Sequence, residues 1–273
     1  TGIDFYAVER PRARVTLLSD YRILDFAWAG LGRRIAVSAI PAGDVNGRVA
    51  LFMLEVAGPY GDCAALCPEP AQPVVLDPAA TATGGLYFAG WSPTVSTLAL
   101  WTGPVDAWTR GGALALSLVS PAGGAPTPIA RTIVNRSWIR WSPDGEQLLV
   151  VEGSDDRGSR HVLKLCAASQ GCQALNRPAV SVVDPAWSRA GRVASVVTSV
   201  PVAESPSGSG APDAARSLWV ADADGGAARV VARGAVSAPQ WLPDARHLLF
   251  VRGQTLWLVD VDRGAPAAIC LLY

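Results

Sequence analysis

Two Asp-rich phrases in the sequence contain the Asp-x-Asp spacing with which a calcium-binding loop begins. They are ADADGG at 221–226 and DVDRG at 260–264. Both contain the Asp-x-Asp start of a calcium loop, but such a loop also needs a Glu at its twelfth position, where this sequence has Arg233 and Leu271. We therefore interpret both phrases as hairpin turns, in which Asp accepts backbone N–H groups and Gly adopts a positive φ. We predict no metal site and no cofactor.

Nucleophilic catalysis finds little support in the sequence. A serine hydrolase needs Gly-x-Ser-x-Gly at a strand-to-helix turn, and the sequence contains no such phrase. The two histidines, His161 and His247, fall into no pattern with a nucleophile. A pair of carboxylates for glycoside chemistry stays open, because such pairing in space is invisible in a sequence. We expect a protein without catalytic residues.

The five cysteines suggest disulfides. Cys166 and Cys172 stand at the two ends of an expected hairpin connection, and Cys63 and Cys67 lie between two strand-like segments. Each pair could form a bridge if its loop brings the Cα atoms to about 5.5 Å. Free thiols in a cytosolic protein and a zinc site are the alternatives, although the CxxxC and CxxxxxC spacings are unlike those of zinc sites. Disulfides would place the protein in an oxidising compartment outside the cytoplasm, with Cys270 left over.

The charge and hydropathy of the chain argue against two kinds of partner. The 23 basic and 23 acidic side chains cancel, whereas a nucleic-acid-binding surface needs a basic excess. No uninterrupted run of about 18 apolar residues predicts a membrane-spanning helix. We expect a protein partner, and we expect any membrane anchor to come from a segment preceding Thr1.

A phrase that begins with Trp recurs five times along the chain. Its clearest copy is WSPDG at 141–145, and the Trp residues are Trp28, Trp91, Trp141, Trp187 and Trp241. A polar turn and an alternating apolar segment follow each Trp, and then a second pair of strand-like segments. Each repeat therefore reads as four strands, named a to d here. Such repeats predict an all-β fold, a β-propeller of four-stranded blades in which Trp packs between blades.

The repeats divide the expected single propeller domain, 1–273, into five complete blades and a half blade. The blades span about 21–78, 79–131, 132–178, 179–233 and 234–273. Residues 1–20 match only a c–d pair, which predicts a half blade at the N-terminus. We favour six blades, one of them incomplete, over five.

The phrases WSPDG at 141–145 and LWVADADGG at 218–226 resemble the TolB-like repeat, also called the PD40 or WD40-like repeat. The resemblance covers nearly the whole chain, although Thr94 replaces the Asp of the second copy. Proteins with this repeat include the periplasmic protein TolB, the substrate-gating propellers of prolyl-oligopeptidase-type peptidases, and many bacterial lipoproteins. The resemblance implies a binding scaffold outside the cytoplasm.

We therefore expect a non-enzymatic, extracytoplasmic bacterial scaffold that mediates protein–protein interaction in an envelope or surface assembly. The alternatives are the propeller of a larger peptidase, and a propeller that binds a glycan or small molecule. The b–c loops differ most between repeats, and variable loops on a rigid scaffold are common binding sites. Trp108 and Arg110 lie in one such loop. Both residue types are frequent at interface hot spots.

Replacing Trp108 and Arg110 by alanine is accordingly expected to weaken binding of the partner protein, because it removes two hot-spot side chains. Co-purification of the partner with the wild-type and doubly substituted chains measures the effect. Equal recovery of the partner would show that this loop is not the docking site.

Overall fold

The described part of the chain consists almost entirely of β-strands. The computed structural model describes residues 2–7, 10–30, 34–44, 47, 49–55, 84–104, 112–122, 124–153, 160–167, 171–175, 181–198 and 216–269. Within these ranges, the sole helical element is one turn of 3-10 helix, η2 (Arg136–Trp138). The chain divides into two compact units. The first is Thr1–Thr109 with Leu114–Pro128, and the second is Arg110–Ala113 with Ile129–Tyr273.

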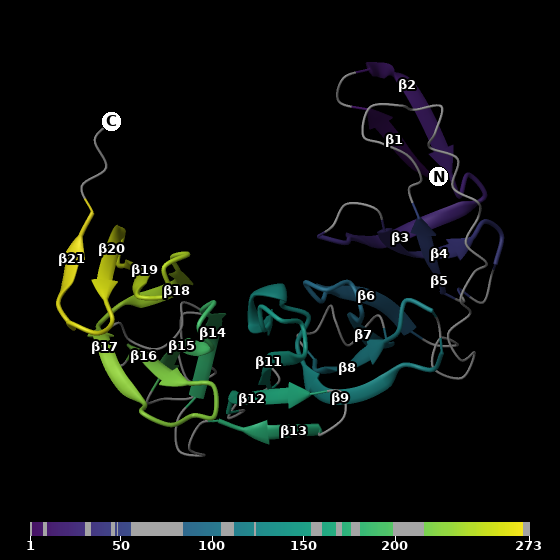
Figure 1. Ribbon diagram of the computed structural model, residues 1–273. Coiled ribbons are helices and arrows are strands. Elements are labelled where there is room, and N and C mark those ends of the chain that lie inside the picture. The colour runs from purple at the N-terminus through teal and green to yellow at the C-terminus, as the bar shows by residue number, and fades with distance from the viewer. Residues whose placement is uncertain are drawn as a thin grey trace. The chain divides into compact units, whose positions relative to one another are not determined.

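The first unit begins with a hairpin and continues with two sheets (Figure 1). We call the sheet of β3, β4 and β5 the first blade and the sheet of β6, β7, β8 and β9 the second blade; the division between the units falls within β9. The strands are β1 (Ile3–Ala7), β2 (Arg10–Leu17), β3 (Tyr21–Trp28), β4 (Arg34–Pro41), β5 (Ala50–Glu55), β6 (Gly84–Trp91), β7 (Leu98–Pro104), β8 (Leu114–Val119) and β9 (Thr127–Thr132).

The second unit contains three four-stranded sheets, the third, fourth and fifth blades, each formed from four consecutive strands. The third blade comprises β10 (Ile139–Trp141), β11 (Gln147–Glu152), β12 (Val162–Ala167) and β13 (Gly171–Ala174). The fourth comprises β14 (Ser181–Trp187), β15 (Arg192–Thr198), β16 (Arg216–Asp222) and β17 (Arg229–Arg233). The fifth comprises β18 (Val236–Trp241), β19 (His247–Arg252), β20 (Thr255–Asp260) and β21 (Pro266–Ala268).

The second strand of a blade is apolar on both faces. In β4 the six residues 35–40 are all buried, and in β11 the four residues 148–151 are buried. A strand with one wet face alternates between apolar and polar residues, whereas a strand covered on both faces has a continuous apolar run. The sequences IAVSAI and LLVV therefore form strands because both faces of the sheet are covered.

The hydrophobic cores lie between successive blades. One core joins the first and second blades and includes Leu51 and Phe88. In the second unit, one core joins the third and fourth blades, and another joins the fourth and fifth through Leu218 and Phe250. Burying one such side chain stabilises the fold by about 1.5–3 kcal/mol, so contacts between sheets contribute much of the stability of each unit.

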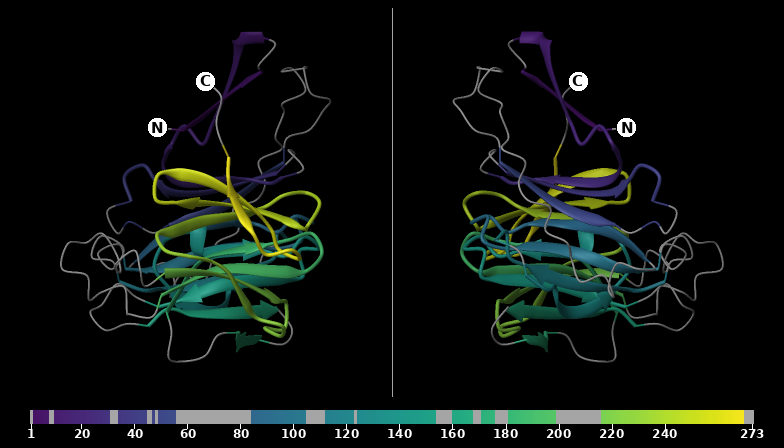
Figure 2. Two further views of the ribbon diagram at one scale, coloured as in Figure 1. Left: turned by 90° about the vertical axis from the view of Figure 1, so that its left-hand side faces the viewer. Right: turned by 90° about the vertical axis from the view of Figure 1, so that its right-hand side faces the viewer.

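The hairpin of β1 and β2 projects from the first blade, as the purple strands show in Figures 1 and 2. The backbone N–H of Gly2 donates to the carbonyl of Tyr21 at 3.1 Å, which fixes the base of the hairpin to the start of β3. Ile3, Leu17 and Leu18 pack against the core of the first blade on its face away from the second blade. This two-stranded sheet stands where the sequence predicts a half blade.

The turn after Trp141 is built by hydrogen bonds from Ser142. Its hydroxyl donates to Asp144 at 2.5 Å and accepts the N–H of Gln147 at 2.9 Å. Gly145 donates to the carbonyl of Ser142 at 2.9 Å and adopts a φ of 76°. These bonds occupy the polar groups of the phrase, which confirms that it is a turn.

The same turn recurs after three other Trp residues. The position of Gly145 is taken by Gly191 with a φ of 80°, by Val95 with 57° and by Ala245 with 55°. A residue with a Cβ loses roughly 1–2 kcal/mol in this left-handed region. The fold therefore imposes the turn even where the sequence disfavours it.

Substituting Gly191→Ala is expected to lower the free energy of unfolding by about 1 kcal/mol, because the new Cβ meets no neighbour and adds only backbone strain. Urea denaturation measures the loss. Gly30→Ala is the matched control, since Gly30 also has open space around it but lies outside the left-handed region. It should leave stability unchanged or slightly raised; equal losses at both positions would contradict the argument.

Candidate functional site

The Trp that ends the first strand of a blade binds the preceding blade. The indole N–H of Trp91 donates to the carbonyl of Ala27 at 3.0 Å. In the second unit, Trp187 donates to Arg140 at 3.0 Å and Trp241 donates to Ala186 at 3.3 Å. Each acceptor is the residue just before the Trp of the preceding blade. The predicted position of Trp between blades is confirmed at these three interfaces.

A carboxylate adds a second bond at two of these interfaces. Asp25, three residues before Trp28, accepts the N–H of Phe88 at 2.9 Å. Asp184, three residues before Trp187, accepts the N–H of Ala238 at 3.4 Å. The strand pairing shifts register near each of these four residues, so β-bulges turn the backbone N–H groups out of their own sheets.

Asp25 also influences a neighbouring phenol. Burial raises the pKa of Tyr87, and the negative charge of Asp25 raises it further. The hydrogen bond between Phe88 and Asp25 is partly buried, and there it is stronger than it would be in water.

The first blade presents two large aromatic side chains to solvent. Phe26 is 57% exposed and Trp28 is 47% exposed, and both lie on β3. Within the described ranges, they are the exposed large hydrophobic residues of the chain. They stand opposite Val37 and Ile35 on β4, and both of these are buried. The aromatic pair therefore forms a strip along the innermost strand of an otherwise covered face.

Other blades cover the positions that correspond to this strip more fully. Trp91, the counterpart of Trp28, is 9% exposed, and the other counterparts, Trp141, Trp187 and Trp241, are half-buried. Ile139, Pro185 and Pro239, which like Phe26 stand two residues before a Trp, are all buried. An exposed apolar strip on a rigid strand suits the binding of another macromolecule. We call Phe26 and Trp28 the β3 strip and take it as the candidate binding site.

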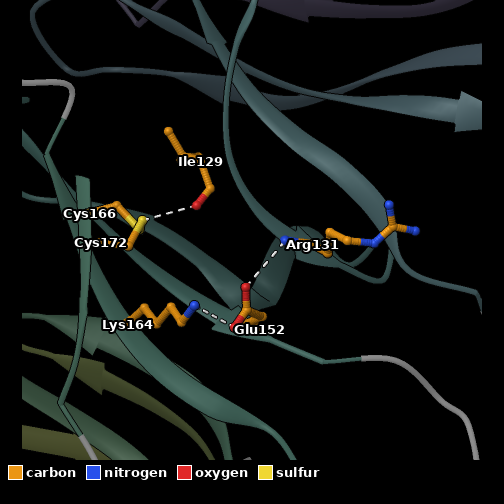
Figure 3. The surroundings of a disulfide bond; sticks show 6 residues. All are labelled: Ile129, Arg131, Glu152, Lys164, Cys166 and Cys172. Carbon is orange, nitrogen blue, oxygen red and sulfur yellow. Dashed lines mark hydrogen bonds and ion pairs between the residues drawn. A yellow bond between two sulfur atoms is a disulfide. The ribbon is translucent and has the colours of Figure 1, made fainter.

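The predicted disulfide between Cys166 and Cys172 is present (Figure 3). The two residues are direct partners in the pairing of β12 with β13, so the bond closes the hairpin across its strands. Cys172 Sγ lies 3.2 Å from the carbonyl oxygen of Ile129. Nearby, Lys164 forms an ion pair with Glu152, whose other oxygen lies 3.5 Å from the backbone N of Arg131.

The other residues predicted to form a site lie outside the described residues. They are Cys63, Cys67, Trp108 and Arg110, and the unpaired Cys270 lies outside them as well. The structure therefore brings together one predicted pair, Cys166 with Cys172.

The Asp-rich phrases are turns, as predicted. Asp224 accepts the N–H of Gly226 at 2.7 Å, and Asp260 accepts the N–H groups of Asp262 and Arg263 at 3.1 and 3.3 Å. Among the residues that the structure describes, no group of three or more His, Cys, Asp or Glu side chains could hold a metal ion.

Ion pairs join the turns of the fourth and fifth blades. Arg192 on β15 donates to Asp262 at 2.9 Å, across the two blades. Arg246 donates to Asp260 through two nitrogens at 2.6 and 3.0 Å, and this interaction lowers the pKa of Asp260 to about 2. These charges bind one another and hold the two turns together.

A cavity of about 540 Å³ lies between the third and fourth blades. Apolar side chains such as Leu163, Val182 and Val197 line most of it, and Asp222 is its one charged lining residue in the described part of the chain. This lining offers a ligand shape and apolar contact but little directional chemistry.

The repeat pattern predicts that Trp28 lies between blades, and it does not distinguish the exposed pair. The alternation Phe26–Ala27–Trp28 in β3, with a small residue between two aromatic ones, is the one local signal for the pair. It predicts that both rings share one face, but not that this face is open.

Substituting Trp241→Phe is expected to lower the free energy of unfolding by about 1 kcal/mol, because it removes the N–H that donates to the carbonyl of Ala186. Trp257→Phe is the matched control, since its buried indole nitrogen has no hydrogen-bond partner among the described residues. Urea denaturation compares the two variants. A loss for Trp257→Phe as large as that for Trp241→Phe would show that ring size, and not the inter-blade bond, carries the effect.

No protein-family model matches the chain, and no curated protein matches it. Several solved structures are similar to the chain. Dipeptidyl peptidase 4 of Porphyromonas gingivalis matches with a TM-score of 0.60 and 13% identity, over 88% of this chain and 36% of the peptidase. An oligogalacturonate lyase in complex with manganese matches with a TM-score of 0.53 and 15% identity, over 98% and 72% of the two chains.

The putative TolB of Agrobacterium tumefaciens matches with a TM-score of 0.47 and 16% identity, over 98% of this chain and 87% of that one. At such identities the similarities concern the fold alone. The four-stranded antiparallel sheets and the similarities with TM-scores of 0.60 and 0.53 confirm the predicted all-β fold, a β-propeller of four-stranded blades.

Proposed function

We propose that the protein is a non-enzymatic, extracytoplasmic scaffold that binds another protein in a bacterial envelope or surface assembly. The observation that carries this proposal is the exposure of Phe26 and Trp28 on a strand of the first blade. Buried aromatic rings contribute about 150–250 Å² each to an interface and dominate its energetics. The β3 strip therefore offers the centre of a protein-binding surface.

The rigidity of the strip supports this role. β3 pairs along its length with β4, and Trp28 and Phe26 are direct partners of buried residues there. A side chain held on a paired strand loses little conformational entropy on binding, because its backbone is already ordered. Aromatic anchors of this kind are frequent at interface hot spots.

The surroundings of the two histidines support the non-enzymatic part of the proposal. His161 is 2% exposed and packs against Trp138 with its ring tilted, at 4.5 Å between ring centroids. His247 Nδ1 lies 2.6 Å from Asp244 in an exposed turn. Each histidine is thus engaged with a neighbour that helps to hold a blade.

The disulfide supports a location outside the cytoplasm. Cys166 and Cys172 are bonded across β12 and β13. Such bonds persist in oxidising compartments and are rare in the reducing cytosol. Among the described residues, no helix is long and apolar enough to cross a membrane.

A second candidate function is that of the propeller of a larger peptidase. The similarity to the P. gingivalis dipeptidyl peptidase, with a TM-score of 0.60 and coverage of 36% of that chain, favours it. In that case, the β3 strip would contact a catalytic domain of the same assembly and not a separate protein.

The proposal predicts that a photo-crosslinking amino acid, p-benzoylphenylalanine, at position 26 captures a distinct protein in cells of the native host. The same residue at position 267, which is exposed on β21, is the matched control. Capture at position 26 alone, followed by identification of the captured chain, would support a binding scaffold. Equal capture at both positions, or none, would contradict the proposal, and capture of a hydrolase domain would select the second candidate.

With the captured protein purified, the substitutions Phe26→Ser and Trp28→Ser are each expected to raise its Kd about 30-fold, the effect of a hot-spot side chain. Isothermal titration calorimetry measures Kd. Arg22→Ser, also exposed on β3, should leave the Kd unchanged. Unchanged binding by both aromatic variants would show that the partner docks elsewhere.

A further inference from the structure

We propose that two arginines, Arg216 and Arg252, bind a small oxyanion, a phosphate or a carboxylate, at the interface between the fourth and fifth blades. The site lies within the second unit, where β16 begins and β19 ends. It shares no residue with the β3 strip, so the inference goes beyond the proposed function. Three observations support it: the direction of the two side chains, the N–H donors buried beside them, and the ion pairs elsewhere in the same two blades.

The two arginines project into the same interface from opposite sides. Side chains two residues apart in a strand share a face of the sheet. Arg216 is two residues before Leu218 in β16, and Arg252 is two residues after Phe250 in β19. Leu218 and Phe250 are both fully buried in the core that joins the fourth and fifth blades. Both arginine side chains therefore point toward the end of this interface.

Gly234 brings the two side chains to one place. Its backbone N–H donates to the carbonyl of Arg216 at 3.1 Å. A Cβ at Gly234 would lie 3.4 Å from Nε of Arg252, so the guanidinium of Arg252 lies over this glycine. Arg233 pairs with Ser217. The residue after Arg233 therefore faces the side that carries Arg216, and the two arginine side chains flank one glycine.

Two N–H groups at this interface are buried and have no hydrogen-bond partner among the described residues. They are Nε of Arg216 and Nε1 of Trp257. Trp257 packs against the same core, and its ring centroid lies 5.2 Å from Cζ of Arg252. A buried donor that lacks a partner costs about 1–3 kcal/mol. A ligand that accepts hydrogen bonds here would remove this cost.

The charges identify this ligand as an anion. In the described part of the chain, neither Arg216 nor Arg252 forms an ion pair with an acidic side chain. At the other end of the same two blades, Arg192 and Arg246 are each paired with an aspartate. A guanidinium presents its N–H donors in a planar fork that matches two oxygens of a carboxylate or phosphate. Two such groups beside an indole N–H suit a small oxyanion.

Isothermal titration calorimetry of the full chain with sodium phosphate, and separately with sodium acetate, tests the site at an ionic strength held constant with sodium chloride. We expect saturable 1:1 binding, and the anion bound more tightly identifies the ligand class as phosphate or carboxylate. Arg216→Gln and Arg252→Gln are each expected to raise the Kd about 10-fold, because each removes a charge-assisted hydrogen bond.

Arg233→Gln is the matched control, because it removes the same charge from the opposite face of the fourth blade beside Gly234. It should leave the Kd unchanged. Arg252 is exposed, so Arg252→Gln tests the site even if Arg216→Gln does not fold.

Absence of saturable binding of both anions would overturn the inference, as would unchanged binding by both arginine variants. An equal rise in Kd for Arg233→Gln would also overturn it, because the effect would then come from net charge and not from this site. None of these outcomes affects capture of a protein at position 26, so the proposed function would be tested separately.

Discussion

A four-stranded sheet whose second strand is apolar on both faces cannot bury those faces by itself. In this protein the burial comes from the neighbouring sheet, as the cores that join the first to the second blade and the fourth to the fifth blade show. The fold of each unit thus depends on contacts between sheets, and the indole bonds of Trp91, Trp187 and Trp241 fix how the second, fourth and fifth blades meet the blade before them. A hydrogen bond adds direction to hydrophobic burial, which has none of its own.

That constraint also explains why an exposed strip is informative. Trp28 has the same place in its strand as Trp91, yet 47% of it is exposed against 9%. The difference cannot come from the local sequence, because both residues end a first strand and precede a turn. It comes from the surroundings of each strand in the folded unit, where Trp91 packs against the first blade and donates to Ala27.

The polar features of the described residues mostly bind one another. Ser142 and Asp144 satisfy the turn after Trp141, and Arg246 with Asp260 ties two turns of the fifth blade. The disulfide of Cys166 and Cys172 closes the outer hairpin of the third blade. Polar groups that are already paired have little capacity left for a ligand. The β3 strip is therefore a better candidate binding site than these polar groups.

The sequence by itself determined the fold class, the turns and one disulfide. The Trp-turn phrase, the apolar runs of the second strands and the six-residue separation of Cys166 and Cys172 are local signals, and each depends on neighbouring residues. The tertiary structure alone decided that Phe26 and Trp28 are exposed while Ile139 is buried. It also decided that Val95 and Ala245 adopt a glycine-like φ. These properties depend on which sheet face meets which neighbour, and residues far apart in the chain control that contact.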